Sequence, residues 1–229
     1  MSARPAPPAQ MRLPLQSELP DGAAGFVVSD SNRTAFEAVQ DWPNLIGGTM
    51  AICGPEGSGK SRLGQLWAER VAAAAVHGAE AALVDPLEIE GRPVLLDDAM
   101  QADDETLFHL INLAQAPGGA LLLIDRPAPS AWEVRLPDLR SRLDAVISVP
   151  VEAPDDAVLA AMLEARFAER GIRPAKDVIP YLLRRIDRSA AAAAAVVERL
   201  DVLHRPVTRA LAREVVEGGE ESGELFDPA

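Results

Sequence analysis

Short apolar runs alternate with amphipathic segments along the first two thirds of the chain. Five runs have the length and apolar character of buried strands and are bounded by Gly, Pro or Asp. They are Thr49–Cys53, Ala81–Val84, Pro93–Leu96, Ala120–Ile124 and Ala145–Val149. Between them, Lys60–His77 and Asp103–Ala116 repeat apolar residues at helical spacing. This alternation predicts an α/β domain over residues 24–150, with a parallel sheet and helices on both faces.

The pattern changes after Pro150, where the remaining apolar positions repeat only at helical spacing. Four helices are predicted there: Asp155–Arg170, Lys176–Ile186, Ser189–His204 and Thr208–Glu217. They predict a small all-helical domain over residues 151–217. Residues 1–23 begin with a Pro/Ala-rich stretch and are expected to form a flexible tail. Residues 218–229 are acidic and Gly-rich, which predicts a solvated tail.

Composition narrows the possible classes of protein. The chain has 229 residues, of which 48% are hydrophobic, so it can bury a sizeable core. Its net charge of −13 disfavours strong contact with nucleic acid, although a local basic patch remains compatible with that charge. The single cysteine, Cys53, excludes an intrachain disulfide framework. The sequence has neither a run of 18 apolar residues nor an apolar secretory leader, so we expect a cytoplasmic protein.

A phosphate-binding loop follows the first predicted strand. Residues 54–61 match the pattern G-x-x-x-x-G-K-[ST], with glycines at Gly54, Gly57 and Gly59, followed by Lys60 and Ser61. The glycines allow backbone N–H groups to surround phosphate oxygens, and the N-terminus of the following helix adds partial positive charge. Lys60 is expected to reach the β- and γ-phosphates and Ser61 to bind Mg²⁺. The flanking strand and helix disfavour a coincidental Gly-rich turn.

Two carboxylates end the strand that begins at Pro93. Asp97 and Asp98 are placed by this strand at the carboxyl edge of the sheet, beside the predicted phosphate site. Asp97 is expected to hold the Mg²⁺ shell, and Asp98 to polarise an attacking water. The alternative is a strand end followed by two acidic loop residues with no chemical role.

Three further segments resemble motifs of the DnaA-like AAA+ family. Ala120–Pro127 resembles the sensor 1 strand, which implies a catalytic role for Asp125. Leu136–Leu143 resembles the arginine-finger segment, which implies that Arg142 acts on a nucleotide bound by a neighbouring subunit. Phe26–Asn32 resembles the adenine-side motif and implies that Asn32 contributes to nucleotide binding. The resemblance covers residues 26 to about 215 and implies an AAA+ fold with a helical lid that binds ADP or ATP with Mg²⁺. Taken singly, Asp125 is also compatible with a buried strand edge, and the arginines with a salt-bridged helix face.

Within this family the chain is most similar to the Hda-type regulators. Only 36 residues separate Ser61 from Asp97, which leaves little room for the extra helix with which initiators grip single-stranded DNA. We also expect no helix-turn-helix domain after the lid, and therefore no sequence-specific DNA binding. Near the N-terminus, Gln10, Leu13, Pro14 and Leu15 resemble a sliding-clamp-binding peptide. The resemblance implies two partners, the DnaA initiator and the β sliding clamp of DNA polymerase III, with a homo-oligomer also possible.

One lid position departs from the family pattern. Where the sensor 2 helix usually carries an arginine that touches the nucleotide, this chain has Ala191 within six consecutive alanines. Arg188 lies about one helical turn earlier and is a candidate substitute. We therefore expect nucleotide binding with weak intrinsic turnover. The leading hypothesis is a negative regulator of replication initiation that stimulates ATP hydrolysis by DnaA. The alternatives are a free-standing DnaA-like ATPase that acts in helicase loading, and a generic P-loop phosphotransferase.

Overall fold

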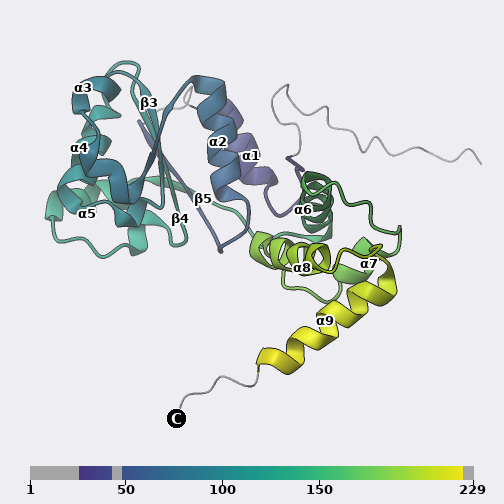
Figure 1. The fold of residues 1–229 in the computed structure, drawn as a ribbon. Coiled ribbons are helices and arrows are strands. Elements are labelled where there is room, and N and C mark those ends of the chain that lie inside the picture. The colour runs from purple at the N-terminus through teal and green to yellow at the C-terminus, as the bar shows by residue number, and fades with distance from the viewer. Residues whose placement is uncertain (1–25, 43–47, 224–229) are drawn as a thin grey trace, which may run out of the picture.

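The computed structural model describes residues 26–42 and 48–223, and Figure 1 shows an α/β part beside a group of helices. Five parallel strands form one sheet in the order β2-β3-β4-β1-β5. Their bounds are β1 Thr49–Cys53, β2 Ala74–His77, β3 Pro93–Asp97, β4 Ala120–Asp125 and β5 Ile147–Pro150. The helices of this part are α1 Arg33–Asp41, α2 Lys60–Val71, α3 Pro86–Ile89, α4 Asp104–Leu113 and α5 Pro137–Asp144. The predicted parallel sheet with helices is confirmed.

Both faces of the sheet are buried, which explains why the interior positions of the central strands are apolar. Leu122 and Ile124 of β4 face a core that includes the stacked rings of Trp42 and Trp67, whose centroids are 4.9 Å apart. Leu121 and Leu123 face the opposite core, which α4 and α5 cover. Figure 1 shows α1 and α2 on one side of the sheet and α3, α4 and α5 on the other.

The predicted second strand was wrong in position. Ala81–Val84 was expected to be a strand, but a 3₁₀ helix spans Gly78–Leu83 and the strand lies earlier, at Ala74–His77. The expected helix Lys60–His77 accordingly ends at Val71. Ala72 adopts the left-handed conformation (φ 54°, ψ 42°) and donates its backbone N–H to the carbonyl of Ala68, which closes the helix without a glycine. The chain then reverses into an edge strand.

The helices after Pro150 are α6 Asp156–Glu169, α7 Val178–Leu182, α8 Ala190–Val202 and α9 Arg209–Gly223. They enclose a separate apolar core that includes Leu163, Phe167 and Val197. The alanines at the start of α8 permit a close approach to α6, and Ala193 is fully buried. We expected the last helix to end at Glu217, but α9 continues to Gly223, so the tail predicted from residue 218 begins as helix. Within the described residues, every helix is too short or too polar to cross a lipid bilayer.

Candidate functional site

The loop between β1 and α2 has the backbone conformation that its glycines predict. Gly57 (φ +72°) and Gly59 (φ +94°) both adopt positive φ, which costs L-residues conformational energy. A Cβ on Gly54 would lie 2.1 Å from the carbonyl oxygen of Val151, so only glycine fits against the chain that follows β5. No side chain caps the N-terminus of α2, so its first N–H groups remain available to bind an anion. Arg126, which follows β4, forms an ion pair with Glu56 across this loop.

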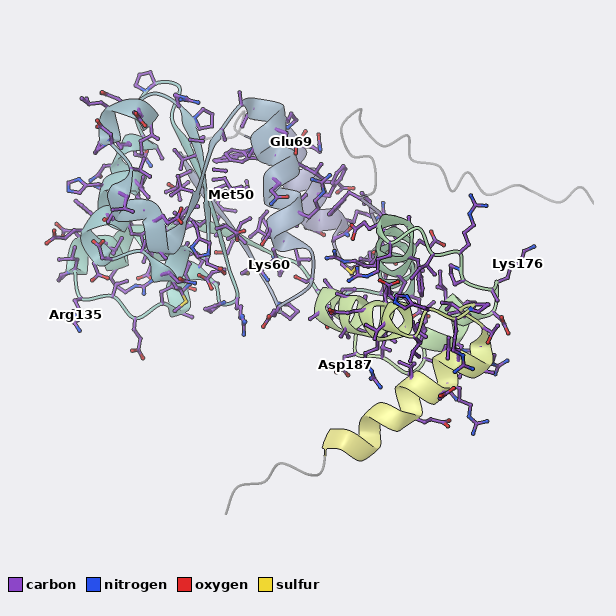
Figure 2. All side chains as sticks on the ribbon, in the orientation of Figure 1. Met50, Lys60, Glu69, Arg135, Lys176 and Asp187 are labelled. Carbon is purple, nitrogen blue, oxygen red and sulfur yellow. The ribbon has the colours of Figure 1, made fainter. Side chains whose placement is uncertain are left out.

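Lys60 is the first residue of α2 and is buried at the centre of the loop. Its ammonium Nζ donates a hydrogen bond to the carbonyl of Pro55 at 2.7 Å. Burial lowers the pKa of Lys60, and the nearby carboxylates of Asp125 and Asp97 oppose this shift without cancelling it. Phosphate oxygens would replace one carbonyl dipole with full negative charge, so an anionic ligand would stabilise the protonated amine. Figure 2 shows Lys60 at the end of α2 nearer to the group of helices α6–α9, which we call the lid.

Ser61 and Asp97 lie side by side although 36 residues separate them. The hydroxyl of Ser61 donates to Oδ1 of Asp97 at 3.2 Å. A hydroxyl and a carboxylate oxygen at hydrogen-bond distance form a donor set suited to Mg²⁺, which commonly takes one or two protein oxygens and completes its shell with water and phosphate. The described residues contain no cluster of three or more His, Cys, Asp or Glu suited to a metal ion. The two side chains therefore fit a nucleotide-bound Mg²⁺ better than an all-protein metal centre.

Asp98 adopts the left-handed conformation (φ 50°, ψ 51°), which aims its carboxylate along the sheet toward the edge strand β2. Its Oδ2 lies 3.1 Å from Nε2 of His77. Because Nδ1 of His77 accepts the backbone N–H of Ala79 at 3.3 Å, the proton resides on Nε2 and is donated to Asp98. Sequence reasoning missed His77, since the misplaced strand assigned it to the end of a helix. A strand placed at Ala74–His77 would have put it next to Asp97 at the carboxyl edge.

Asp125 ends the central strand β4, directly between β1 and β3. Its Oδ2 accepts the backbone N–H of Met100 at 2.7 Å, and its Oδ1 accepts that of Arg126 at 2.7 Å. This carboxylate therefore ties the segment after β3 to the end of β4, and its charge acts on Lys60. The structure thus brings together Lys60, Ser61, Asp97, Asp98 and Asp125 at one edge of the sheet.

A cavity of about 620 Å³ lies between the phosphate loop, the segment after Phe26 and the lid, a size typical of small-molecule sites. From α6 it is lined by one face of the helix, with Val158, Ala161, Met162 and Ala165. Arg62 of α2 and Arg166 of α6 also line the cavity, and neither was singled out from the sequence. Arg166 pairs with Glu169 at 3.0 Å, so its charge is already compensated.

Asn32 lines this cavity but uses its side-chain amide within its own segment. Its Oδ1 accepts the backbone N–H of Ser29 at 3.0 Å, and its Nδ2 donates to the carbonyl of Val27 at 2.9 Å. Asn32 is 3% exposed, so it fixes the loop that presents Phe26 and Val27 to the cavity. Sequence reasoning assigned Asn32 to nucleotide binding, and the structure places it in the cavity wall with its side-chain amide bonded within its own segment.

Neither of the two lid positions considered from the sequence, Ala191 and Arg188, is among the residues that line the cavity. Arg188 donates to Oδ1 of Asp156 at 2.6 Å and to the carbonyl of Pro154 at 3.2 Å, and it is not among the residues that line the cavity. Ala190, at the start of α8, does line it, and its backbone N–H donates to the carbonyl of Gly57 at 3.2 Å. The lid thus touches the phosphate loop through backbone and small side chains.

Arg142 lies on α5, on the side of the sheet away from the lid. Its guanidinium carbon is 4.9 Å from the ring centroid of Phe108 on α4, and it forms no ion pair with the described residues. Arg140, two residues earlier in α5, is held by the carbonyls of Trp132 and Pro129 and by Asp144. The predicted clamp-binding residues Gln10, Leu13, Pro14 and Leu15 lie outside the described residues.

Comparisons with known proteins agree with this architecture. No family model matches the chain. The chromosomal replication initiator protein DnaA of Thermomicrobium roseum is 25% identical over 124 residues, which make up 52% of this chain and 27% of that protein. Among solved structures, domain III of DnaA from Thermotoga maritima covers 85% of this chain and 95% of its own length, with a TM-score of 0.69 and 17% identity. AMPPCP-bound DnaA from Aquifex aeolicus gives a TM-score of 0.64 at 21% identity and covers 86% of this chain and 68% of its own. The fold is therefore the P-loop AAA+ fold of DnaA domain III, and the chain spans about a quarter of the curated relative that it matches.

Proposed function

We propose that the chain binds ADP or ATP with Mg²⁺ in the cavity between the sheet and the lid. Lys60 and the N–H groups of the phosphate loop would hold the phosphates, and Ser61 and Asp97 would hold the metal ion. The cavity walls formed by Phe26, Val27 and Met162 would take the base. The bound metal would neutralise phosphate charge and orient the terminal phosphate. The AMPPCP complex of the DnaA neighbour supports an adenine nucleotide as the ligand.

We further propose that this chain acts as a negative regulator of replication initiation that promotes ATP hydrolysis by DnaA. The observation that carries this proposal is the unequal distribution of arginines. Arg188 is paired with Asp156 outside the cavity, and Arg166, the one lid arginine that lines the cavity, is paired with Glu169. The chain's own nucleotide would therefore have no lid arginine beside it that lacks a carboxylate partner. Arg142, by contrast, lies on the far side of the sheet with no carboxylate partner among the described residues.

In this proposal Arg142 leaves Phe108 and reaches ATP bound by DnaA. Water attacks the γ-phosphorus, the bond to the β–γ bridging oxygen breaks, and ADP and phosphate are released. The guanidinium stabilises the negative charge that develops on the transferred group, an effect worth roughly 10³–10⁵ in rate for arginine fingers. Gln10, Leu13, Pro14 and Leu15 would recruit the β sliding clamp and so restrict the reaction to replicating DNA. The chain's own ATPase activity would remain weak.

The decisive experiment measures hydrolysis of ATP preloaded on DnaA, with and without this protein and DNA-loaded clamp. We expect the parent chain to stimulate hydrolysis. Arg142→Ala should lower the stimulated rate at least about a hundredfold. Leu13→Ala/Leu15→Ala should make the rate independent of the clamp. Arg135→Ala provides a matched control, since it removes an exposed arginine just before α5. If Arg142→Ala stimulates as well as the parent, the finger assignment is wrong. If the chain alone turns over ATP rapidly and leaves DnaA unaffected, the free-standing ATPase is the better description.

The nucleotide site itself is tested separately by titration calorimetry with ADP and Mg²⁺. Lys60→Ala removes the only side-chain cation of the phosphate loop assigned to the phosphates and should weaken binding at least tenfold, about 1.4 kcal/mol. Lys176→Ala, which removes an exposed lysine at the outer edge of the lid, should bind as the parent does. An unchanged affinity for Lys60→Ala would contradict the phosphate-site assignment.

A further inference from the structure

Positive charge is concentrated in the lid of this otherwise acidic chain. Residues 151–218 contain 11 Lys and Arg against 11 Asp and Glu, whereas residues 26–150 contain 9 against 18. Of these two parts of the chain, the lid is therefore the one that can approach a strongly anionic partner without net repulsion. Of these 11 cations, Arg166 alone is among the residues that line the nucleotide cavity. Figure 2 shows Lys176 at the outer edge of the molecule, away from Lys60.

Two of these cations share one aromatic ring. The guanidinium carbons of Arg185 and Arg209 lie 4.3 and 5.5 Å from the ring centroid of Tyr181. Neither arginine forms an ion pair with the described residues. The ring of Tyr181 holds both guanidiniums in place by cation–π attraction, but it does not neutralise them. Two like charges held close together favour a bound anion, which would offset their repulsion.

Neighbouring residues extend this cluster. The backbone N–H of Ala175 donates to the carbonyl of Val207 at 2.9 Å, which places Lys176 beside the segment that leads into α9. Arg184 precedes Arg185 at the end of α7 and is exposed. We call Lys176, Arg184, Arg185 and Arg209 the lid basic cluster. Nearby Arg205 and Arg213 differ from it, because they are paired with Glu214 at 3.5 Å and Glu217 at 2.8 Å.

We infer that the lid basic cluster binds the phosphate backbone of duplex DNA without reading its sequence. Backbone contacts require cations and release counterions, and these four exposed side chains supply them. A single-stranded ligand would require exposed aromatic rings on which bases stack. The one aromatic residue here, Tyr181, is 5% exposed and is covered by Arg185 and Arg209. This surface is separate from the nucleotide cavity and from Arg142, and it operates without either.

The test is fluorescence anisotropy of a labelled duplex with the full chain, in the absence of nucleotide, DnaA and clamp. We expect binding at about 50 mM salt that weakens steeply by about 200 mM. Arg185→Ala/Arg209→Ala should weaken it at least about tenfold and reduce the salt slope by about two, one per cation removed. Arg185→Lys/Arg209→Lys should retain most of the affinity, which separates lost charge from lost folding.

The matched control is Arg205→Ala/Arg213→Ala, which removes the same net charge from the same side of the lid but only from paired arginines. Its affinity should fall less than about threefold, since charges already paired release few counterions. Equal losses in the two double variants would overturn the inference, as would no binding by the parent at low salt. Polyglutamate is the competing ligand. If it binds through Arg185 and Arg209 and the duplex does not, the cluster recognises an acidic protein and the DNA assignment fails.

Discussion

The hydroxyl of Ser61 donates to Oδ1 of Asp97 at 3.2 Å, which joins the start of α2 to the end of β3. Two elements distant in sequence thereby present their oxygens at one point on the sheet edge. Since β3 and β1 both flank β4, this point lies immediately beside the phosphate loop. In the proposed function, metal binding and phosphate binding would therefore be parts of one site.

We predict that Ser61→Ala uncouples nucleotide affinity from Mg²⁺. The parent should bind ADP more tightly with Mg²⁺ than with EDTA, because the hydroxyl and Asp97 together hold the ion. The variant should bind ADP about equally in both, with a loss of at least about tenfold only when Mg²⁺ is present. Calorimetric titrations with and without EDTA measure both values. Ser141→Ala, at an exposed position of α5, is the control. A Ser61→Ala variant that keeps its Mg²⁺ dependence would contradict this role of Ser61.

A second prediction concerns the contact between the phosphate loop and the lid. A Cβ on Gly57 would lie 2.8 Å from the backbone nitrogen of Ala190, which is closer than real Cβ contacts allow. Gly57→Ala should therefore break the hydrogen bond between these residues and lower both thermal stability and nucleotide affinity. Gly171→Ala is a matched control, since its φ of +66° is similar but nothing lies within 4 Å of its Cβ.

Both variants carry a backbone strain of about 1 kcal/mol for a non-glycine residue in this conformation. The difference between their melting temperatures therefore measures the contact with Ala190 alone. Differential scanning calorimetry without nucleotide should show a lower midpoint for Gly57→Ala. Identical midpoints would mean that the lid yields to the methyl group at no cost.

The sequence predicted those parts of the fold and site that depend on local pattern. β1, β3 and β4 are buried on both faces, so their uninterrupted apolar runs mark them, and their polar ends mark Asp97 and Asp125. The strand Ala74–His77 was not predicted because it is an edge strand with alternately exposed residues. It also continues an alanine run that is typical of helix. The left-handed turn at Ala72 has no glycine to signal it. Because that strand was not predicted, the pairing of His77 with Asp98 was not predicted either.

Hydrogen bonds that the local sequence pattern does not indicate explain the other differences between the sequence predictions and the structure. Arg188 and Asp156 are 32 residues apart, and no local pattern indicates that the arginine turns to the start of α6 rather than to the cavity. Likewise, the pairing of Asn32 with Val27 and Ser29 depends on a loop conformation that composition does not encode. Motif resemblance assigned Asn32 and Arg188 to nucleotide binding, whereas their hydrogen-bond partners follow only from the three-dimensional arrangement of the chain.

A third prediction separates the two arginines of α5. Arg140 donates to the carbonyls of Trp132 and Pro129 at 2.7 and 2.9 Å and pairs with Asp144 at 2.7 Å, so it anchors the loop after β4. Arg140→Ala should lower the free energy of unfolding by about 2 kcal/mol, because charged hydrogen bonds to part-buried carbonyls are lost. Arg142→Ala loses one contact with Phe108 and should cost less than about 1 kcal/mol. Urea denaturation at neutral pH compares them, and equal losses would show that Arg142 is equally structural.

The last prediction concerns acid sensitivity at the start of the lid. Asp155 caps α6 by accepting the backbone N–H of Val158 at 3.0 Å. Burial raises the pKa of Asp155, but hydrogen bonds from the hydroxyl of Ser29 and from the amides of Val158 and Ala157 outweigh it, so the pKa lies below its ordinary value. Since Ser29 lies in the segment that begins at Phe26, this carboxylate joins one wall of the cavity to the lid.

A carboxylate whose pKa is lowered by folding stabilises the protein above its unfolded-state pKa of about 3.9 and loses that contribution as the pH falls through the folded value. Asp155→Ala should therefore cost about 1 kcal/mol at neutral pH, as the loss of an N-cap does. The difference from the parent should shrink progressively below about pH 4, where the parent's own carboxylate becomes protonated. Urea denaturation at several pH values measures this difference. Asp187→Ala removes an exposed lid carboxylate and controls for the loss of one negative charge. A difference between Asp155→Ala and the parent that stays constant down to about pH 2 would show that the ionised carboxylate does not hold the lid to the cavity wall.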